Sequence, residues 1–379
     1  MTEHSFSVAE AQTLCFGNRI PFYTYRLPGA DEVVFGAQLS AEPDVFRGLE
    51  HCRAEKGFII TPFDPSSRSL PYFIKADVSF TDRLTDADMI SALQRTAFDT
   101  PFRETETNDL TRQEYLDAVR RLIDTLRREA LRKVVFARSF AVPLASYAVS
   151  PALFERMKKY RHAFLFMVSI PGKSAWLGVS PELFLSRNRD GFRTMALAAT
   201  QPVTGCARPV EWTAKEREEQ QIVADYVAEV FASVFARPPQ REEAVTVQAG
   251  NVYHLCSRFH SSEQLSAGET DRLIARMHPT PAVCGLPKNR AMQLIAETER
   301  HDRGYYAGLL GPVRRDGTFD LFINIRSMEL FAGTCRLYAG GGVTHRSDPE
   351  SEWTETCRKA DILLNLIPSP RHECIVFRP

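Results

Sequence analysis

The stretch TRQEYLDAVRRLIDTLRREALRKVVFARS, residues 111–139, contains a complete helix signal followed directly by a strand signal. Thr111 and Glu114 have the spacing of a capping box, and apolar residues then recur with helical period up to Arg132. Residues 133–138 are rich in β-branched and aromatic side chains, which favours a strand. The sequence therefore predicts a helix that leads straight into a sheet.

Strand signals elsewhere in the chain arrive in groups between a few long helices. Two further helices are predicted at residues 212–235 and 349–366 from the recurrence of apolar residues. Because strands and helices do not alternate strictly, we expect an α+β fold with large, mainly antiparallel sheets. The predicted strands are residues 163–170, 175–186, 245–260, 304–314, 321–331 and 334–341.

The chain shows no internal repeat, low-complexity tract or Gly/Ser-rich linker. Residues 1–105 contain many turn signals and no chemical motif, and residues 106–367 contain the three predicted helices. With residues 368–379 as a C-terminal tail, we expect one compact structural unit in which the N-terminal portion completes the sheets.

Composition favours small-molecule chemistry. Among 379 residues, 47 Lys and Arg balance 47 Asp and Glu, so the chain has no net attraction to nucleic acid or an anionic membrane. Its apolar stretches are shorter than the roughly 18 residues of a membrane helix, and the N-terminus lacks signal-peptide and transit-peptide features. We therefore expect a cytoplasmic protein, a monomer or weak homodimer. The eight cysteines, without C-x-x-C spacing, are expected to be free thiols: Cys15, Cys52, Cys206, Cys256, Cys284, Cys335, Cys357 and Cys374.

Two predicted helices place acidic residues on the face that should be apolar. Glu216 and Glu219 continue the apolar stripe of the second helix, and Glu352, Glu355 and Lys359 continue that of the last helix. Four inward carboxylates require a solvated cleft or cations, and oxygen ligands suit magnesium. Alternatively, the acids lie in water at the helix N-termini, where the helix dipole favours them.

Several other residues are candidates for chemistry. Lys133 opens a predicted buried strand, where a lowered pKa would make it a general base, or it lies at the surface. Glu182, in an apolar segment, is either a general acid with a raised pKa or an exposed turn residue. Arg326, within a predicted strand, is either a carboxylate clamp or an edge charge, and His254 is by default a core histidine. The run Gly340-Gly341-Gly342 after a strand fits an anion site or a turn.

Residues 110–367 resemble the chorismate-utilising enzymes, which include isochorismate, salicylate, anthranilate and aminodeoxychorismate synthases. The family's fold is an αβ sandwich of large antiparallel sheets flanked by helices, with the active site in a deep central cleft. The matching segments are KVVFARS (133–139), SPELFLS (180–186), ALAATQP (196–202), KEREEQ (215–220), YHL (253–255), HPTPAVCG (278–285), RGYYAG (303–308), FINIRS (322–327), YAGGGV (338–343) and SDPESEWTETCRKA (347–360).

The resemblance implies a role for each candidate residue. Lys133 would activate water and Glu182 would protonate the departing ring hydroxyl. Mg²⁺ would bind Glu219 and Glu355, with Glu216 and Glu352 beside them and partly bridged by water. Substrate would contact a further set, in which Arg326 clamps the enolpyruvyl carboxylate: Arg326, Tyr306, Gly340, Gly341, Lys359, His254 and Thr200.

Three signals imply which reaction the chain performs. A lysine at position 133 marks the family members that add water, and Ala198 replaces the nucleophilic lysine that is common in aminodeoxychorismate synthases. Segment 278–285 has the isochorismate-synthase form. The resemblance thus implies Mg²⁺-dependent isochorismate synthesis without a glutamine amidotransferase partner, feeding menaquinone or, alternatively, siderophore formation.

Three alternatives stay open. A salicylate synthase would go on to eliminate pyruvate, a metal-dependent hydrolase would also use carboxylates, and a chorismate-binding protein would not turn over. The last is suggested by a departure from the family pattern, in which Ala199 and Gln201 replace Gly and Arg. In a second departure, Gln220 replaces the His that commonly follows the metal glutamate. The last change is expected to weaken support of Glu219.

Overall fold

The computed structural model describes residues 5–52, 54–101, 103, 109–144, 149–203 and 210–367. The predicted tail at residues 368–379 and two cysteines, Cys206 and Cys374, lie outside this part. The other six cysteines are buried and unpaired. No described helix is both long and apolar enough to cross a membrane.

One of the two large sheets has nine strands, all paired antiparallel. Its buried strands are nearly continuous runs of apolar side chains, as expected for a sheet covered on both faces. The strands in spatial order are β17 (Gly285–Leu286), β9 (Lys133–Pro143), β21 (Thr334–Val343), β20 (Ser327–Phe331), β11 (Ser174–Ser180), β10 (Phe164–Ile170), β2 (Phe22–Arg26), β3 (Val34–Ala37) and β7 (Val78–Thr81).

The other large sheet has ten strands, again antiparallel. In spatial order they are β14 (Gln240–Arg241), β16 (Val252–Ser261), β13 (Gly191–Pro202), β12 (Leu183–Asn188), β19 (Phe319–Ile323), β18 (Leu309–Val313), β5 (Gly57–Thr61), β6 (Tyr72–Lys75) and β4 (Asp44–Val45), while β15 (Val245–Ala249) pairs beside β16. The predicted strand at 304–314 is therefore shorter, and the one at 245–260 is a hairpin.

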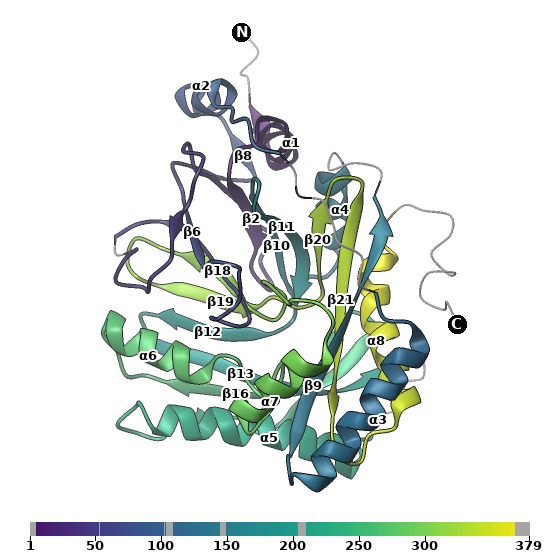
Figure 1. The fold of residues 1–379 in the computed structure, drawn as a ribbon. Helices are drawn as coiled ribbons and strands as arrows, with labels where there is room; N and C mark the ends of the chain where they lie inside the picture. The colour runs from purple at the N-terminus through teal and green to yellow at the C-terminus, as the bar shows by residue number, and fades with distance from the viewer. Residues whose placement is uncertain are drawn as a thin grey trace.

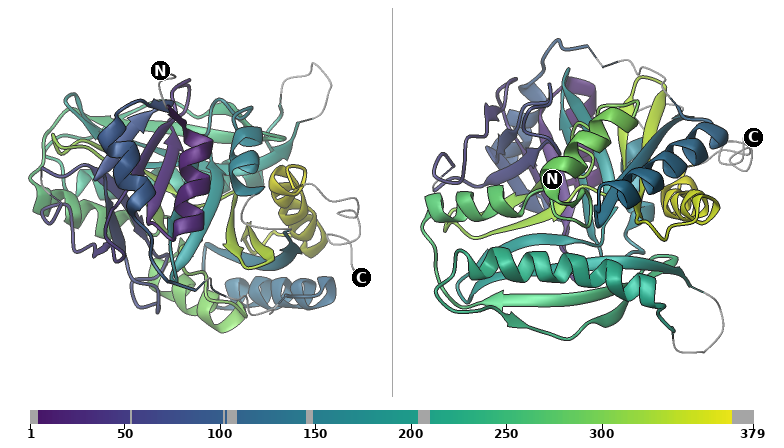
Figure 2. Two further views of the ribbon diagram at one scale, coloured as in Figure 1. Left: turned by 90° about the horizontal axis from the view of Figure 1, so that it is seen from above. Right: turned by 60° about the horizontal axis from the view of Figure 1, so that its bottom comes forward.

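Helices flank the sheets (Figures 1 and 2). Helix α5 runs along β13 and β16, whereas α3 and α8 lie next to each other beside β9 and β21 (Figure 1). The predicted cap of α3 is confirmed, because Thr111 and Glu114 form a capping box. The helices are α1 (Val8–Asn18), α2 (Ala87–Arg95), α3 (Arg112–Arg128), α4 (Ser150–Met157), α5 (Ala214–Ala232), α6 (Ala267–Met277), α7 (Lys288–Thr298) and α8 (Pro349–Leu364), and a two-stranded sheet joins β1 (Phe6–Ser7) to β8 (Arg83–Leu84).

Two predicted strands are wrong in an informative way, because each is broken where the chain crosses between the sheets. Segment 175–186 divides into β11 and β12, and segment 321–331 divides into β19 and β20. Glu182 lies at the first crossing, and Arg326, with a positive φ of 52°, lies at the second. Ser180 Oγ donates to the carbonyl of Ile323 at 2.6 Å, so the two crossings lie side by side.

N-terminal strands belong to both sheets: β2, β3 and β7 to the nine-stranded sheet, and β4, β5 and β6 to the ten-stranded one. The predicted fold class, α+β with large antiparallel sheets flanked by helices, is confirmed.

Candidate active site

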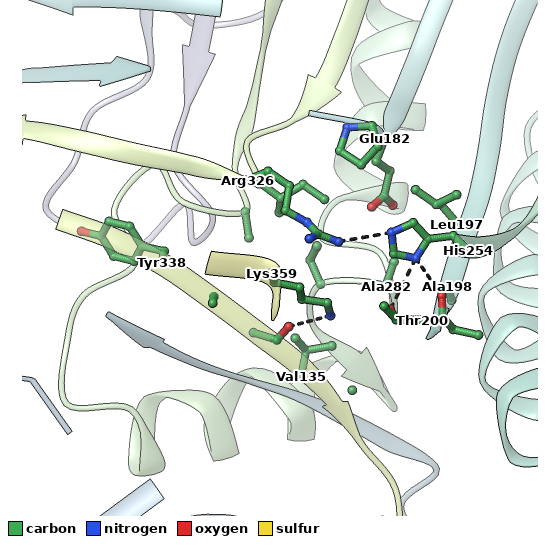
Figure 3. Close-up of a pocket in the computed structure, with 18 of the residues that line it drawn as sticks. Val135, Glu182, Leu197, Ala198, Thr200, His254, Ala282, Arg326, Tyr338 and Lys359 are labelled. Atoms are coloured by element: carbon green, nitrogen blue, oxygen red, sulfur yellow. Dashed lines mark hydrogen bonds between the residues drawn. The ribbon is translucent and has the colours of Figure 1, made fainter. Parts of the chain in front are cut away.

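A pocket lies where residues of both sheets and of helices α5 and α8 meet (Figure 3). The nine-stranded sheet supplies β9 and β21, and the ten-stranded sheet supplies β13 and β16. Most predicted site residues line this pocket: Lys133, Glu182, Thr200, Glu219, His254, Tyr306, Arg326, Gly340 and Lys359. Of the four others, Glu216, Glu352 and Glu355 lie on the same two helices, and Gly341 lies on β21.

Arg326 presents a buried guanidinium that is only partly satisfied. Its Nη2 donates to Nε2 of His254 at 3.2 Å, while its Nη1 is buried without a hydrogen-bond partner. Burial lowers the pKa of Arg326 to about 10, so it stays charged at neutral pH. A buried donor without a partner is costly, and such a group next to a pocket is suited to an anionic ligand.

His254 holds this arginine in place. Its Nδ1 lies 2.7 Å from the carbonyl oxygen of Ala199 and 3.4 Å from Thr200 Oγ1. Burial, followed by the charge of Arg326, lowers the pKa of His254 to about 3, so the imidazole is neutral. Donating Nδ1–H to the carbonyl leaves Nε2 to accept from Arg326 (Figure 3).

Glu182 faces the same space as Arg326 (Figure 3). Its burial raises the pKa to about 8, although Lys133, Lys359 and Arg326 act in the opposite direction. The carboxyl is therefore protonated at neutral pH, as a general acid must be.

Lys133 begins β9 and its side chain is only 1% exposed, so it is not a surface lysine. Its Nζ lies 3.0 Å from Oε1 of Glu219 on α5. This contact depends on Gly342, because a Cβ there would lie 2.6 Å from Lys133 Cε and 2.4 Å from Glu219 Oε1. The glycine run is part of β21 and does not follow it, which corrects the predicted end of that strand.

The two carboxylates of α8 are each paired with a lysine. Glu355 Oε1 lies 2.5 Å from Lys359 Nζ, and Glu352 Oε1 lies 3.1 Å from Lys215 Nζ. Burial and the neighbouring Glu355 raise the pKa of Glu352 to about 7. Burial also acts to raise the pKa of Glu355, but the hydrogen bond and charge of Lys359, together with the charge of Lys215, act against it and the pKa is lowered.

Glu216 is engaged differently. Its Oε2 accepts from the backbone N–H and the hydroxyl of Thr213, both at 2.8 Å, and closes the capping box of α5. The same oxygen accepts from Gln201 Nε2 at 2.8 Å. The predicted part of Glu216 in a metal site stays a prediction, while its observed contacts are those of a helix cap.

We tested whether these carboxylates suit a divalent cation. Among the described residues, no group of three or more His, Cys, Asp or Glu side chains is arranged so that it could hold a metal ion. Three carboxylates nevertheless approach the Gly341-Gly342 segment, where a Cβ on Gly341 would lie 2.9 Å from Glu352 Oε2 and 3.9 Å from Glu355 Oε1. Glu352 Oε2 is buried without a hydrogen-bond partner. Oxygen donors with an unsatisfied member fit a hard cation such as Mg²⁺.

The remaining substrate candidates also lie at the pocket wall. Lys359 Nζ donates to the carbonyl of Gly340 at 2.8 Å (Figure 3). Tyr306 stacks on Tyr338 with ring centroids 5.0 Å apart, and its burial raises the pKa to about 12. Tyr306 is therefore a neutral aromatic wall at physiological pH.

The departures from the family pattern have structural partners. Ala199 has a positive φ of 62° at a register shift of β13, and it packs with Trp212 and Leu255. Gln220 donates to Ser257 Oγ at 3.0 Å in the interior. Ala199 lines the pocket, whereas Gln220 follows Glu219 on α5 and points into the interior.

Sequence reasoning did not single out two cations beside the site, Lys215 and Arg303. Lys215 lies within the KEREEQ segment and pairs with Glu352 across the two helices. Arg303 lines the pocket and opens the RGYYAG segment. Its spacing of four residues from Glu299 was the available signal, since such pairs often form ion pairs.

Known proteins are similar to this chain in sequence. Isochorismate synthase EntC of Escherichia coli is 28% identical over 323 residues, covering 80% of this chain and 79% of the relative. The vibriobactin-specific isochorismate synthase of Vibrio cholerae is 27% identical over 262 residues, 66% of each protein.

Solved structures share the fold. The isochorismate synthase DhbC of Bacillus anthracis has a TM-score of 0.75 at 20% identity and covers 95% of this chain and 99% of its own. Anthranilate synthase component I of Streptococcus pneumoniae has a TM-score of 0.63 at 17% identity, covering 90% and 89%.

The profile of the family described as chorismate binding enzyme matches residues 71–365. This match covers most of the chain and confirms the resemblance carried by the sequence motifs. The protein therefore belongs to the family of chorismate binding enzymes.

Proposed function

We propose that this protein is an isochorismate synthase that converts chorismate reversibly to isochorismate. The observation that carries this proposal is the pairing, in one pocket, of buried Lys133 with a protonated Glu182 beside the half-satisfied guanidinium of Arg326. Lysine at this position is the feature that distinguishes the water-adding members of the family. The similar proteins named isochorismate synthase support the same activity.

In the proposed reaction, a water oxygen bonds to C2 of the ring while the C4–O bond breaks and the ring double bonds shift. Lys133 accepts the proton that the attacking water loses. Glu182 gives its proton to the departing hydroxyl, which leaves as water. Water is both consumed and released, so the reaction is an isomerisation with no net change in atoms, and the two groups exchange roles in reverse.

The pocket binds the substrate through its two carboxylates. Arg326 Nη1, which lacks a protein partner, is oriented by His254 and would donate to the enolpyruvyl carboxylate. Lys359, held by Gly340 and Glu355, adds a second positive charge to the pocket lining. Tyr306, stacked on Tyr338, adds an aromatic surface to the pocket and would contact the substrate ring.

We infer that Mg²⁺ is required, held by Glu219 and Glu355 with Glu352 beside them. When bound, the ion supplies positive charge that fixes the ring carboxylate of the substrate. The unpartnered oxygen of Glu352 and the space left by Gly341 and Gly342 support this assignment.

The first experiment incubates the purified protein with chorismate, with and without MgCl₂, and resolves isochorismate, salicylate and pyruvate by chromatography. We expect isochorismate only when magnesium is present. Formation of salicylate together with pyruvate would show that the protein is a salicylate synthase instead. Unchanged chorismate would contradict the proposal and favour a binding protein.

Matched lysine variants then test the base. Lys133→Met should abolish turnover, whereas Lys75→Met removes a half-exposed lysine that pairs with Asp44 at 3.2 Å far from the pocket. Normal turnover by Lys133→Met would overturn the acid–base assignment.

Menaquinone supply is the destination we propose for the product, with siderophore supply as the alternative. Relatives of both kinds occur: one is named vibriobactin-specific and one solved structure is the menaquinone-specific enzyme of Escherichia coli. Deleting the gene and measuring menaquinone and catechol siderophores in the same cells separates the two.

A further inference from the structure

A buried ion pair beside the pocket has no part in the chemistry proposed above. Arg303 faces Glu299 with both ends of its fork: Nε lies 2.8 Å from Glu299 Oε2, and Nη2 lies 2.5 Å from Oε1. Both side chains are almost fully buried, at 3% and 2% exposure. Removing both charges from water costs free energy that their mutual attraction alone does not repay, so the pair is expected to make further contacts that matter to the protein.

The ion pair contacts the open edge of β9, the strand that carries Lys133. On this edge β17 pairs only with Lys133 and Val134. Just beyond it, Arg303 Nη2 donates to the carbonyl of Val135 at 2.8 Å, and the N–H of Ala137 donates to Glu299 Oε1 at 2.7 Å. Backbone groups of alternate residues on one edge are those that a neighbouring strand would pair. The ion pair thus continues the ladder where β17 ends.

Arg303 also ties this edge to the segment matching HPTPAVCG. Its Nη1 donates to the carbonyl of Val283 at 2.7 Å, and the carbonyl of Cys284 accepts from the N–H of Val135 at 2.6 Å. The guanidinium further covers the ring of Phe63, 4.3 Å from its centroid. β9 is therefore fixed from one side by a loop, a helix end and a single arginine.

The two arginines that line the pocket differ in how many hydrogen bonds their guanidinium groups make within the protein. Arg303 makes four hydrogen bonds within the protein, out of the five N–H groups that a guanidinium offers. Arg326 makes one, to His254, and its Nη1 has no partner. Arg326 is available to a ligand, whereas Arg303 is occupied in holding the protein.

We propose that Arg303 and Glu299 are positioning residues for Lys133, acting through the edge of β9. Side chains of alternate residues project to the same face of a strand, and Lys133 and Val135 both line the pocket. Holding the backbone at Val135 and Ala137 fixes where the amine stands relative to the ring. This inference rests on the proposed role of Lys133 as the base.

The expected signature is a fall in kcat without a matching rise in KM. Displacement of a reacting group by about 1 Å can cost about 100-fold in rate, while substrate binding is carried by other side chains. Arg303→Lys keeps the charge but loses the planar fork, so it cannot serve Glu299, Val135 and Val283 together.

Arg26 offers a matched control. It is buried and donates to two backbone carbonyls, those of Lys158 at 2.7 Å and Tyr160 at 2.6 Å, but it does not line the pocket. Arg26→Lys should therefore lower the free energy of unfolding in a similar way without touching β9.

The experiment compares wild type, Arg303→Lys, Glu299→Gln and Arg26→Lys, each confirmed as folded by circular dichroism and thermal unfolding. We expect kcat to fall about 10- to 100-fold in Arg303→Lys, with KM for chorismate within about twofold, and kcat to be retained in Arg26→Lys. Hydrogen–deuterium exchange should accelerate in peptides covering β9 only in the variants at 303 and 299. Glu299→Gln keeps an acceptor for Ala137 and should show a smaller fall, which provides a second test if Arg303→Lys does not fold.

Three results would overturn the inference. Equal losses of kcat in Arg303→Lys and Arg26→Lys would reduce the ion pair to general stability. A raised KM with unchanged kcat would make Arg303 a substrate ligand. Unchanged hydrogen–deuterium exchange in β9 would show that the ion pair does not hold this strand. Absence of turnover in the wild type would instead refute the proposed function, while the exchange comparison would still report on β9.

Discussion

Helices α5 and α8 carry the same E-x-x-E spacing toward the same pocket, yet their acids do different work. On α5 the first acid, Glu216, is the third helical residue and closes the capping box with Thr213. On α8 the cap is made by Asp348, which accepts from Ser351, so Glu352 comes one residue later and is not needed there. Glu352 is buried and pairs with Lys215.

The comparison teaches that spacing between two acids is not enough to predict their use. An acid three residues after the N-cap can close a capping box and is then engaged by the helix backbone, whereas an acid four residues after it is not. On α5 only Glu219 of the two acids is free of the cap, whereas on α8 neither Glu352 nor Glu355 takes part in one.

The largest effect is expected from the second acid of each helix, since Glu219 and Glu355 are the proposed ligands. Glu219→Gln and Glu355→Gln should each lower kcat at least about 100-fold, because a metal ion supplies several kcal/mol of charge stabilisation. Calorimetric titration with MgCl₂ should show weakened or lost binding in both. Unchanged magnesium binding in either variant would remove that residue from the site.

Glu182 differs from the acids of α5 and α8, because burial, and not a helix cap or a paired lysine, dominates its pKa of about 8. The acid must be protonated to act, so its contribution is nearly complete at neutral pH, is halved near pH 8 and is lost as the pH rises further. We expect kcat to fall about tenfold per pH unit above pH 8 in the wild type. A Glu182→Gln variant whose residual activity keeps this alkaline decline would show that another group titrates.

Glu352 should have an intermediate effect. Glu352→Gln removes a carboxylate beside the proposed ligands, and changes in such supporting groups typically cost about 10- to 100-fold in metal affinity. We expect the magnesium concentration for half-maximal rate to rise by such a factor, with kcat at saturating magnesium largely retained. An unchanged magnesium requirement would leave Glu352 with only its ion pair to Lys215.

The smallest effect is expected at Glu216. Glu216→Ala should cost about 1 kcal/mol of unfolding free energy, as loss of a capping interaction does, and should leave magnesium affinity within about twofold. Glu269 closes an equivalent capping box on α6 with Ser266, so Glu269→Ala is a matched control for denaturant unfolding. Weaker magnesium binding in Glu216→Ala alone would restore Glu216 to the metal site that the sequence predicted.

Local signals sufficed for much of the fold. The cap at Thr111 and the apolar period after it predicted α3, and the β-branched run after it predicted β9 with Lys133 at its start. The predicted start of the last helix at residue 349 is likewise confirmed, because Asp348 caps α8 and Pro349 is its first residue. These features depend on neighbours within a few residues, which a single sequence displays.

Motifs predicted most of the pocket for a related reason. Segments that together match a known family carry the pattern of side chains that its pocket needs, and nine of the predicted residues indeed line one pocket. Their roles as base, acid and ligand remain predictions for the experiments above.

The three long helices α3, α5 and α8, the balance of charge and the residues available for chemistry could all be predicted from the sequence. The tertiary structure was needed to locate where β11 ends before β12 and β19 ends before β20, and these two crossings bring Glu182 close to Arg326. It also decided that Arg303 is occupied and Arg326 is available, because hydrogen-bond partners such as Val283, Val135 and His254 are far apart in sequence. Periodicity reports the face on which a side chain lies, but its partner depends on which distant strand the fold brings there.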